Sequence, residues 1–228
     1  MKVELIHYTQ NPIEAIEKAA STCYDSQPVG SGKIFRHCYK SGHHSVLEFA
    51  DFSFRISGVS RALTHQLVRH RMASYAQRSQ RYCVEDGFEF VTPSSISSKP
   101  EAAELYDNTI AEIQKAYNQL IELGVAAEDA RMLLPNACAS VICVKMNLRE
   151  LIHFCNERLC ACAQWEIRNM ARAMVREVVA VEPELKALLV PKCEAHAPYC
   201  FCTETKKRSC GRHPVIADVM KESESKGE

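Results

Sequence analysis

The sequence contains no apolar run that approaches the roughly 20 residues needed to cross a bilayer as a helix. Its amino-terminal stretch, MKVELIHYTQNPIEAIEKAA, carries acidic residues early and lacks the apolar core of a signal peptide. Both absences argue against a membrane-spanning or secreted protein, and we expect a cytoplasmic location.

The chain also lacks net charge, because 28 basic and 28 acidic residues cancel over its 228 residues. This balance excludes a general polyanion-binding surface, so any anion site must come from a local separation of charge. The 12 cysteines then indicate a reducing compartment, where thiols serve as core residues, redox groups or metal ligands. A chain of this length can fold as one domain without disulfides or metals.

Common nucleotide-binding motifs are missing as well. There is no GxGxxG, and residues 30–33 (GSGK) lack both the upstream glycine and the following Ser or Thr that a phosphate-binding loop requires. Any nucleotide or flavin must therefore be held by side chains.

Apolar patterns predict strands over residues 2–7, 47–56 and 137–146, and strand and turn over residues 82–92. Amphipathic periodicity predicts helices over residues 33–40, 60–71, 101–123, 148–159 and 161–181, one that opens at Asn11-Pro12, and a short one that closes at Leu134-Pro135. Ser60 and Asn147 are the expected N-caps, and residues 72–81 are expected to form an ordered loop. Together these elements predict an α/β or α+β fold in a single domain, with a central mixed sheet flanked by long helices.

Charge is segregated in one stretch, because no Asp, Glu or Lys occurs between Phe52 and Val84. The same stretch contains six arginines: Arg55, Arg61, Arg69, Arg71, Arg78 and Arg81. Guanidinium groups without lysine favour bidentate recognition of phosphate or carboxylate. Since six uncompensated arginines would otherwise repel each other, we favour an anion site over a solvated basic helix end. Gln66, Arg69 and His70 are expected to share a helical face.

Part of this stretch resembles the signature of flavin-dependent thymidylate synthases: Arg69-His70-Arg71, then seven residues, Ser79, and Arg81-Tyr82. Four more stretches match in order: Gly42-His43 with Glu48, and residues 130–135 (ARMLLP), 156–158 (NER) and 163–168 (AQWEIR). The resemblance covers roughly residues 1–190, expected as the synthase domain, and leaves residues 191–228 as a Cys/His-containing tail.

The resemblance implies the reductive methylation of dUMP to dTMP. In that reaction 5,10-methylenetetrahydrofolate donates the one-carbon unit, reduced FAD donates the hydride, and NADPH regenerates reduced FAD. It further implies a homotetramer whose active sites lie between subunits, with small molecules as partners and neither nucleic acid nor membrane.

The resemblance also implies roles for individual residues. The implied FAD contacts are His43, Ser45, Glu48, Arg69, His70, Arg71, Asn156 and Arg158. The implied dUMP contacts are Gln66, Arg69, Gln77, Arg78, Ser79, Gln80, Arg81 and Arg168. Arg168 is expected to be catalytic, because a cation at the uracil carbonyl edge favours ionised N3 and makes C5 more nucleophilic. Spacing alone would instead place Arg168 in a polar helical stripe with Gln164, Arg172 and Arg176. Ser79 is assigned to binding, since an unactivated hydroxyl is a poor nucleophile.

Two positions depart from the family pattern. Many members place a Thr-Arg pair after the Leu-Pro, and its arginine touches the dUMP phosphate, whereas this chain has Ser140-Val141. Lys145 could replace that arginine only if its segment is helical. Cys162 stands where a polar flavin contact is common.

The tail leaves alternatives open. It contains the potential metal ligands Cys193, His196, Cys200, Cys202, Cys210 and His213. Because the spacing C-x6-C-x-C-x7-C is not a standard zinc-finger pattern, we predict reduced cysteines without metal, and keep a zinc or iron–sulfur site on Cys193, Cys200, Cys202 and Cys210 as the alternative. Residues 222–228 (ESESKGE) are expected to be disordered.

Two rival functions use the same features. A nucleic-acid-binding module would use the arginine-rich stretch and bind in a salt-sensitive way. A metal-binding regulatory protein would use the cysteines of the tail, but would leave the ordered motifs of the rest of the chain unexplained.

Overall fold

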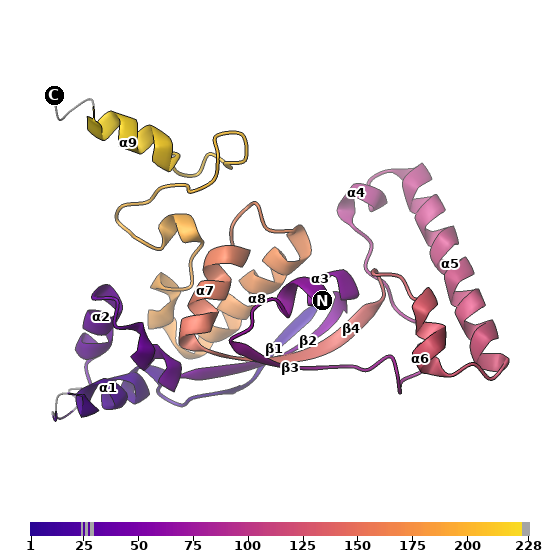
Figure 1. The fold of residues 1–228 in the computed structure, drawn as a ribbon, viewed down its shortest axis with the longest axis horizontal. Coiled ribbons are helices and arrows are strands. Elements are labelled where there is room, and N and C mark those ends of the chain that lie inside the picture. The colour runs from indigo at the N-terminus through magenta and orange to yellow at the C-terminus, as the bar shows by residue number, and fades with distance from the viewer. Residues whose placement is uncertain (24, 26, 28–29, 225–228) are drawn as a thin grey trace. The chain divides into compact units, whose positions relative to one another are not determined.

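A four-stranded sheet is the centre of the computed structural model, which describes residues 1–23, 25, 27 and 30–224 (Figure 1). Its strand order is β1 (Lys2–Tyr8), β2 (Asp51–Ser60), β4 (Ala139–Asn147) and β3 (Ala73–Gln77). All neighbours are antiparallel: the flanking backbone bonds include Thr9 N–H to Asp51 O at 3.0 Å, Leu148 N–H to Ala50 O at 2.7 Å and Arg78 N–H to Val141 O at 2.9 Å. The predicted mixture of strands and helices is confirmed, but the mixed sheet is wrong, because each neighbouring pair runs in opposite directions.

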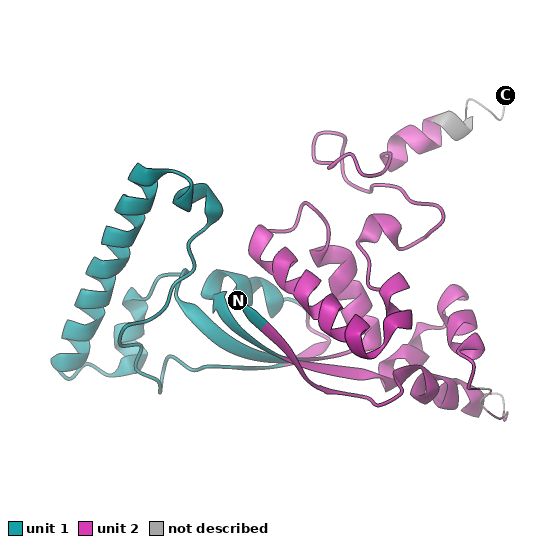
Figure 2. Cartoon of the chain, turned by 180° about the vertical axis from the view of Figure 1, so that it is seen from behind, with its two compact units in different colours: residues 1–2, 55–69, 75–144 teal, residues 3–54, 70–74, 145–228 magenta. Residues whose placement is uncertain are grey.

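The chain divides into two compact units (Figure 2). Unit 1 consists of residues 1–2, 55–69 and 75–144, and unit 2 of residues 3–54, 70–74 and 145–228. Each of the four strands contributes residues to both units, so the division follows no linker.

Unit 1 contains several helices in addition to its strand residues. Its helical elements are α3 (Arg61–Leu67), α4 (Ser94–Ser97), α5 (Pro100–Glu122), α6 (Ala127–Ala130) and the 3₁₀ turn η2 (Arg131–Leu133). A small core of Phe88, Ile110 and Cys138 holds α5 against the start of β4. The fully buried Tyr117 adds a polar anchor, because its hydroxyl accepts the N–H of Glu85 at 3.0 Å.

Unit 2 contains the remaining helices. They are α1 (Pro12–Thr22), α2 (Lys33–Lys40), α7 (Leu148–Arg158), α8 (Trp165–Val181), α9 (Ile216–Glu224) and the 3₁₀ turns η1 (His44–Phe49), η3 (Pro183–Ala187) and η4 (Lys192–Glu194). α7 packs against η1, α8 and η4, and buries Leu151, Phe154 and Cys155. α8 buries Ile167 and Met170 in turn.

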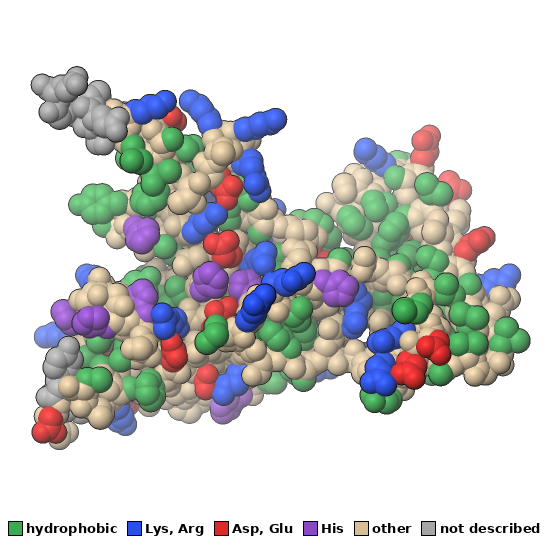
Figure 3. Space-filling model, viewed as in Figure 1, with side chains coloured by type: hydrophobic (Ala, Val, Ile, Leu, Met, Phe, Trp, Pro, Cys, Tyr) green, Lys and Arg blue, Asp and Glu red, His purple; other side chains and the backbone are tan. Residues whose placement is uncertain are grey.

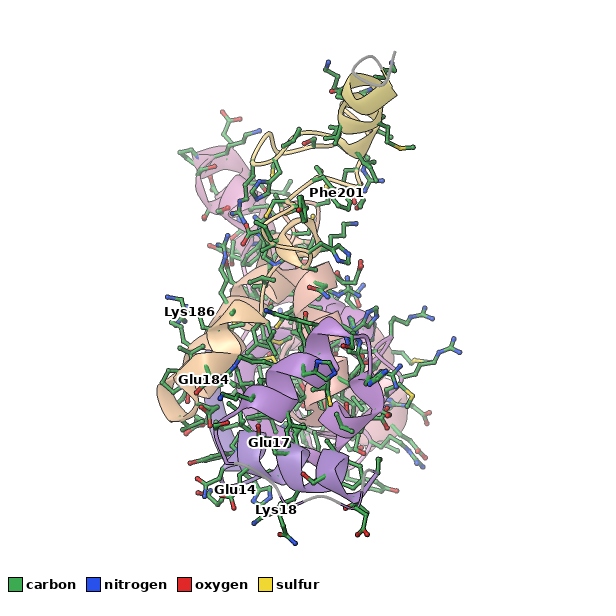
Figure 4. The ribbon with its side chains drawn as sticks, turned by 90° about the vertical axis from the view of Figure 1, so that its left-hand side faces the viewer. Glu14, Glu17, Lys18, Glu184, Lys186 and Phe201 are labelled. Carbon is green, nitrogen blue, oxygen red and sulfur yellow. The ribbon has the colours of Figure 1, made fainter. Side chains whose placement is uncertain are left out.

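Acidic side chains fasten α2 to its neighbours in unit 2 (Figure 4). The buried carboxylate of Glu17 on α1 accepts the N–H groups of Ile34 and Phe35 at 3.0 and 3.4 Å. A negative charge at the first turn of a helix is favourable, because the unpaired N–H groups point toward it. Arg36 pairs with Glu184 of η3 at 2.8 Å.

Both predicted N-caps are confirmed. The hydroxyl of Ser60 accepts the Leu63 N–H at 3.0 Å, and the amide oxygen of Asn147 accepts the Glu150 N–H at 2.9 Å. The helix predicted over residues 161–181 begins later, at Trp165, because the side-chain oxygen of Gln164 caps it.

The helix predicted over residues 60–71 ends at Leu67, so the shared helical face of Gln66, Arg69 and His70 is wrong. The Tyr75 hydroxyl donates to the Leu67 carbonyl at 2.8 Å, which satisfies a carbonyl that a longer helix would use. Arg69 then belongs to unit 1 and His70 to unit 2.

Four further boundaries differ from the prediction. Residues 47–49 form the end of η1 instead of a strand, and residues 82–92 contain only an isolated bridge from Phe90 to Cys138. Residues 73–77 form β3 instead of a loop, since its half-buried side is made of Ala73, Tyr75 and Gln77 and gives little apolar signal. Of the stretch predicted to be disordered, residues 222–224 belong to α9 and residues 225–228 lie outside the described part. Among the described helices, none is both long and apolar enough to span a bilayer.

Candidate functional site

A cavity of about 810 Å³ lies in unit 2. The end of α2, the turn η1 and one face of α7 form its walls, and Ala195 and His196 of the tail complete its lining. Its volume falls within the range of roughly 300–1,000 Å³ that is usual for ligand pockets. On the face that Figure 3 draws, histidines lie among cationic and acidic side chains.

A polar stripe of α7 lines the cavity. Arg149, His153 and Asn156 fall at i, i+4 and i+7, so they project from the same side of the helix. The side-chain oxygen of Asn156 is buried and has no hydrogen-bond partner. A buried unpaired acceptor costs about 1–3 kcal/mol, so this oxygen marks a place for a ligand donor. Arg149 and His153 are lining residues not predicted from the sequence, although their spacing is visible in it.

A buried chain of polar groups lies next to this wall. The Arg158 side chain donates from Nε to Nε2 of His70 at 3.0 Å, and Nδ1 of His70 lies 3.1 Å from the carboxylate of Glu150. Since Nε2 accepts, the ring proton must be on Nδ1, which donates to Glu150. The edge of the His70 ring packs on Phe154, with centroids 5.0 Å apart. Glu150 also lines the cavity, so the chain connects the interior to the ligand space.

His70 is neutral in this arrangement. Burial, followed by the charges of Arg158 and His153, lowers the pKa of His70 to about 4. Burial raises the pKa of the Glu150 carboxyl. Only 6% of the His70 surface is exposed, and both of its ring nitrogens are engaged by Arg158 and Glu150.

The other predicted FAD contacts divide into two groups. Glu48 lines the cavity and accepts a bond from Arg149 at 2.6 Å. His43, Ser45 and Arg71 are exposed and do not line it, and Arg69 belongs to unit 1. Among the eight predicted contacts, the structure therefore brings together Glu48, His70, Asn156 and Arg158.

In unit 1, the glutamines of the predicted dUMP segment are held in place by their side chains. Gln77 donates to the hydroxyls of Thr64 and Ser140 at 3.0 and 3.3 Å. Gln80 is buried and donates to the sulfur of Cys138 at 3.6 Å. These bonds fix the strand end that carries the motif.

Ser79 and Gln66, two further residues of the predicted dUMP set, contact atoms of their own chain segments. The hydroxyl of Ser79 accepts the N–H of Arg81 at 3.3 Å. Gln66 donates to the Ala62 carbonyl at 3.4 Å, while Arg69 is exposed. These contacts show no base positioned to activate Ser79.

Two arginines of the stretch find acids outside it, which corrects the expectation that they are uncompensated. Arg78 pairs with the buried Glu85 at 3.1 Å, and this contact raises the pKa of Arg78. Arg81 pairs with Glu128 of α6 at 2.9 Å. Glu85 lies seven residues after Arg78, just beyond the stretch, whereas Glu128 is 47 residues from Arg81 and only the fold brings it near.

Lys145 does not replace the missing arginine at Val141. Its segment is the strand β4, where helical spacing does not apply, and its ammonium pairs with Asp51 in unit 2 at 2.9 Å. Val141 instead lines a cavity of about 460 Å³ in unit 1 together with Arg78.

Arg168 stands in the first turn of α8. Its Nη1 donates to the Ala161 carbonyl at 2.6 Å, which fixes one side of the guanidinium. Its Nε is buried and has no hydrogen-bond partner. Asn156 and Arg168 are thus two predicted site residues that both present buried, unsatisfied polar atoms.

Replacing His70 is expected to flatten the pH dependence of stability. Below its ordinary value near 6.5 the imidazole takes up a proton in the unfolded chain, whereas the folded chain resists until about pH 4. The free energy of unfolding therefore falls as pH drops from 6.5 to 4, by roughly 3 kcal/mol for this group. Urea unfolding of His70→Gln should lack this part of the slope. Equal slopes in His70→Gln and the exposed control His7→Gln would contradict a neutral, buried His70.

The comparisons with known proteins cover most of the chain. A family model described as "Thymidylate synthase complementing protein" matches residues 4–184. A protein named flavin-dependent thymidylate synthase from Geobacter sulfurreducens is 44% identical over 207 residues, covering 85% of this chain and 88% of the relative. One of the same name from Nitratidesulfovibrio vulgaris is 39% identical over 237 residues, covering 94% and 96%.

Solved structures agree on the fold. Thymidylate Synthase X from Helicobacter pylori, crystallised with FAD and dUMP, superposes with a TM-score of 0.68 at 22% identity, covering 83% of this chain and 99% of that one. The UMP/dUMP methylase PolB from Streptomyces cacaoi gives 0.72 at 23% identity, covering 82% and 93%. The matched family model and the identity to curated relatives over most of both chains establish that this chain belongs to the family of flavin-dependent thymidylate synthases.

Proposed function

We propose that this chain is an FAD-dependent thymidylate synthase that methylates dUMP to dTMP, with 5,10-methylenetetrahydrofolate as the one-carbon donor and NADPH as the source of electrons. The observation that carries the proposal is the match between the family signature and two buried atoms. The Asn156 oxygen and the Arg168 Nε lack partners at residues where the signature implies flavin and uracil contacts.

The residues of unit 2 fit an FAD molecule. The 810 Å³ cavity offers the unpaired oxygen of Asn156 as an acceptor, and the side chains of Lys40, Arg149 and His153 as donors. When bound, FAD in its reduced form supplies the hydride that completes the methyl group. We assign Glu48 to this site as the group that orients Arg149.

His70 and Arg158 act by positioning, in our proposal. A neutral His70 accepts from Arg158 and donates to Glu150, so both charged groups are held at fixed places beside the cavity. Such support keeps site residues from relaxing when a ligand enters. The remaining flavin assignments, His43, Ser45, Arg69 and Arg71, rest on the resemblance alone.

The dUMP site is assigned to the segment of residues 77–81 with Gln66, Arg69 and Arg168. Ser79 is assigned to binding, since its hydroxyl contacts the Arg81 N–H and an unactivated hydroxyl is a poor nucleophile. The Val141 side chain cannot bind a phosphate, and Arg78 is the candidate to do so in its place. The backbone N–H of Arg78 donates to the Val141 carbonyl, and both residues line one cavity. Gln77 and Gln80 hold the segment.

Arg168 is assigned the chemical role. Its guanidinium is fixed on one side by the Ala161 carbonyl and has an unsatisfied buried N–H on the other. A fixed cation that meets charge developing on the uracil ring lowers the barrier without reorganisation during the reaction. A uracil ring that is ionised at N3 is more nucleophilic at C5 than the neutral ring.

The wider features of the enzyme follow from the same proposal. We infer a homotetramer with active sites between subunits, a cytoplasmic location, and no nucleic-acid or membrane partner. The synthase domain is assigned to residues 1–190 and the tail to residues 191–228. The ion pairs of Arg78 and Arg81 speak against a polynucleotide site, since they neutralise two of the six arginines.

Arg168→Ala is expected to lower dTMP formation by roughly 10²–10³-fold while FAD stays bound. The assay follows conversion of dUMP in the presence of methylenetetrahydrofolate, FAD and NADPH, and the flavin content is measured on the same sample. The control is Arg172→Ala, one turn further along α8 and exposed. Wild-type turnover in Arg168→Ala would remove the chemical role of Arg168.

Asn156→Ala is expected to weaken FAD binding by about tenfold, because one buried hydrogen bond is worth about 1.4 kcal/mol when its partner is removed. Titration of the flavin-free protein with FAD, followed by flavin fluorescence, gives the affinity. Asn169→Ala on the exposed side of α8 is the matched control. Unchanged affinity in Asn156→Ala would mean that its buried oxygen faces some other ligand.

A further inference from the structure

A second, much smaller cavity in unit 2 is ringed by sulfur. Its volume is about 20 Å³, enough for one water-sized body. Two of its lining cysteines come from the loop between α7 and α8, and three cysteines and a histidine come from the tail. They are Cys160, Cys162, Cys193, Cys202, Cys210 and His213.

The tail is folded so that its donors converge. The N–H of Phe201 donates to the Cys193 carbonyl at 3.2 Å, and Cys202 forms a parallel bridge with Val215. This bridge closes the segment between them into a loop that returns Cys210 and His213 to Cys202. The thiol of Cys162 reaches the carbonyl of Arg208 in that loop at 3.3 Å.

The carboxylates around the cavity are paired with cations, whereas the cysteines form no disulfides. The donor atoms of Cys160, Cys162 and Glu204 lie within 4.8 Å of one another, as do those of Cys193, Glu194 and His213. Each carboxylate already has a cation: Lys192 pairs with Glu204 at 2.7 Å, and Arg212 pairs with Glu194 at 2.9 Å. The 12 cysteines are all free thiols, so no disulfide accounts for their convergence.

We propose that Cys160, Cys162, Cys193 and His213 bind one zinc ion in tetrahedral geometry. Three cysteines and one histidine form a ligand set that is common in structural zinc sites, and soft thiolates suit this metal. Each of the two donor groups contributes its two residues other than the carboxylate, because Glu204 and Glu194 are already paired with Lys192 and Arg212. On binding, each ligating thiol gives up its proton to solvent.

The site differs from the one the sequence suggested. Cys200 belonged to the expected alternative set, but it does not line the cavity. Cys160, which lies outside the tail, lines it instead. The ion would therefore join the tail to the loop before α8, which no spacing within the tail could indicate.

By joining the tail to the loop before α8, the zinc ion would also affect the proposed active site. This consequence rests on the proposed function. Ala161, between Cys160 and Cys162, provides the carbonyl that accepts from Arg168. Ala195 and His196, which follow Cys193, line the 810 Å³ cavity. A zinc ion would thus fix both the loop that holds Arg168 and the tail segment that completes the cavity wall.

The test is the metal content of the full chain, purified with reductant and without chelator, by elemental mass spectrometry. We expect about one zinc per chain. Cys160→Ser, Cys162→Ser, Cys193→Ser and His213→Gln should each lose it, whereas Cys200→Ser and Cys210→Ser should keep it. Circular dichroism of every variant shows whether a loss reflects unfolding, and Cys160→Ser, whose residue lies outside the tail, is the decisive variant.

Three results would overturn the proposal. They are a wild-type chain without stoichiometric zinc, iron with acid-labile sulfide in its place, and a folded Cys160→Ser variant that keeps its zinc. Metal content is measured without turnover, so a zinc-loaded chain that makes no dTMP would refute the proposed function and leave the site standing. Removal of zinc by a chelator should also make the tail beyond residue 191 sensitive to protease, which the Cys160→Ser variant should reproduce.

Discussion

The buried hydrogen-bonded chain from Arg158 through His70 to Glu150 is the constraint on which the candidate flavin site depends. It ties the segment of residues 70–74 to α7, and it does so in the interior, where an unpaired polar group costs about 1–3 kcal/mol. Because the imidazole stays neutral, its two nitrogens have distinct roles, one accepting and one donating. The central residue of the Arg-His-Arg motif therefore holds Arg158 and Glu150 through its two ring nitrogens.

Buried polar atoms without partners indicate where ligands belong. Folding usually satisfies such atoms, so an orphan on the wall of a cavity is informative. Asn156 contributes an acceptor in the last turn of α7, and Arg168 contributes a donor in the first turn of α8. The short loop between these turns carries Cys160 and Ala161, so the proposed zinc site and the proposed chemistry meet in one stretch of chain.

The sequence predicted the elements that local signals control. Ser60 and Asn147 cap their helices as expected, and the residues of the Arg-His-Arg signature led to the family. The end of α3 was not predictable, because the hydroxyl of Tyr75 reaches back eight residues to close it. β3 was missed for a related reason: its inward side chains are too polar to give an alternating apolar pattern.

Long-range pairing explains most of the remaining differences. Glu128, which neutralises Arg81, is 47 residues away from it, and the partner of Lys145 is nearly a hundred residues away. Composition and spacing carry no information on such contacts. Arg149 and His153 are different, since their helical spacing with Asn156 could have identified a polar stripe facing a ligand.

The visible absorption spectrum of the freshly purified full-length chain, recorded before and after addition of dUMP, shows whether flavin and nucleotide share one site. We expect the absorption bands of bound flavin and a change in those bands when dUMP enters, because both ligands would lie together. A colourless protein that does not take up added FAD, or a flavin spectrum that dUMP leaves unchanged, would contradict a shared site.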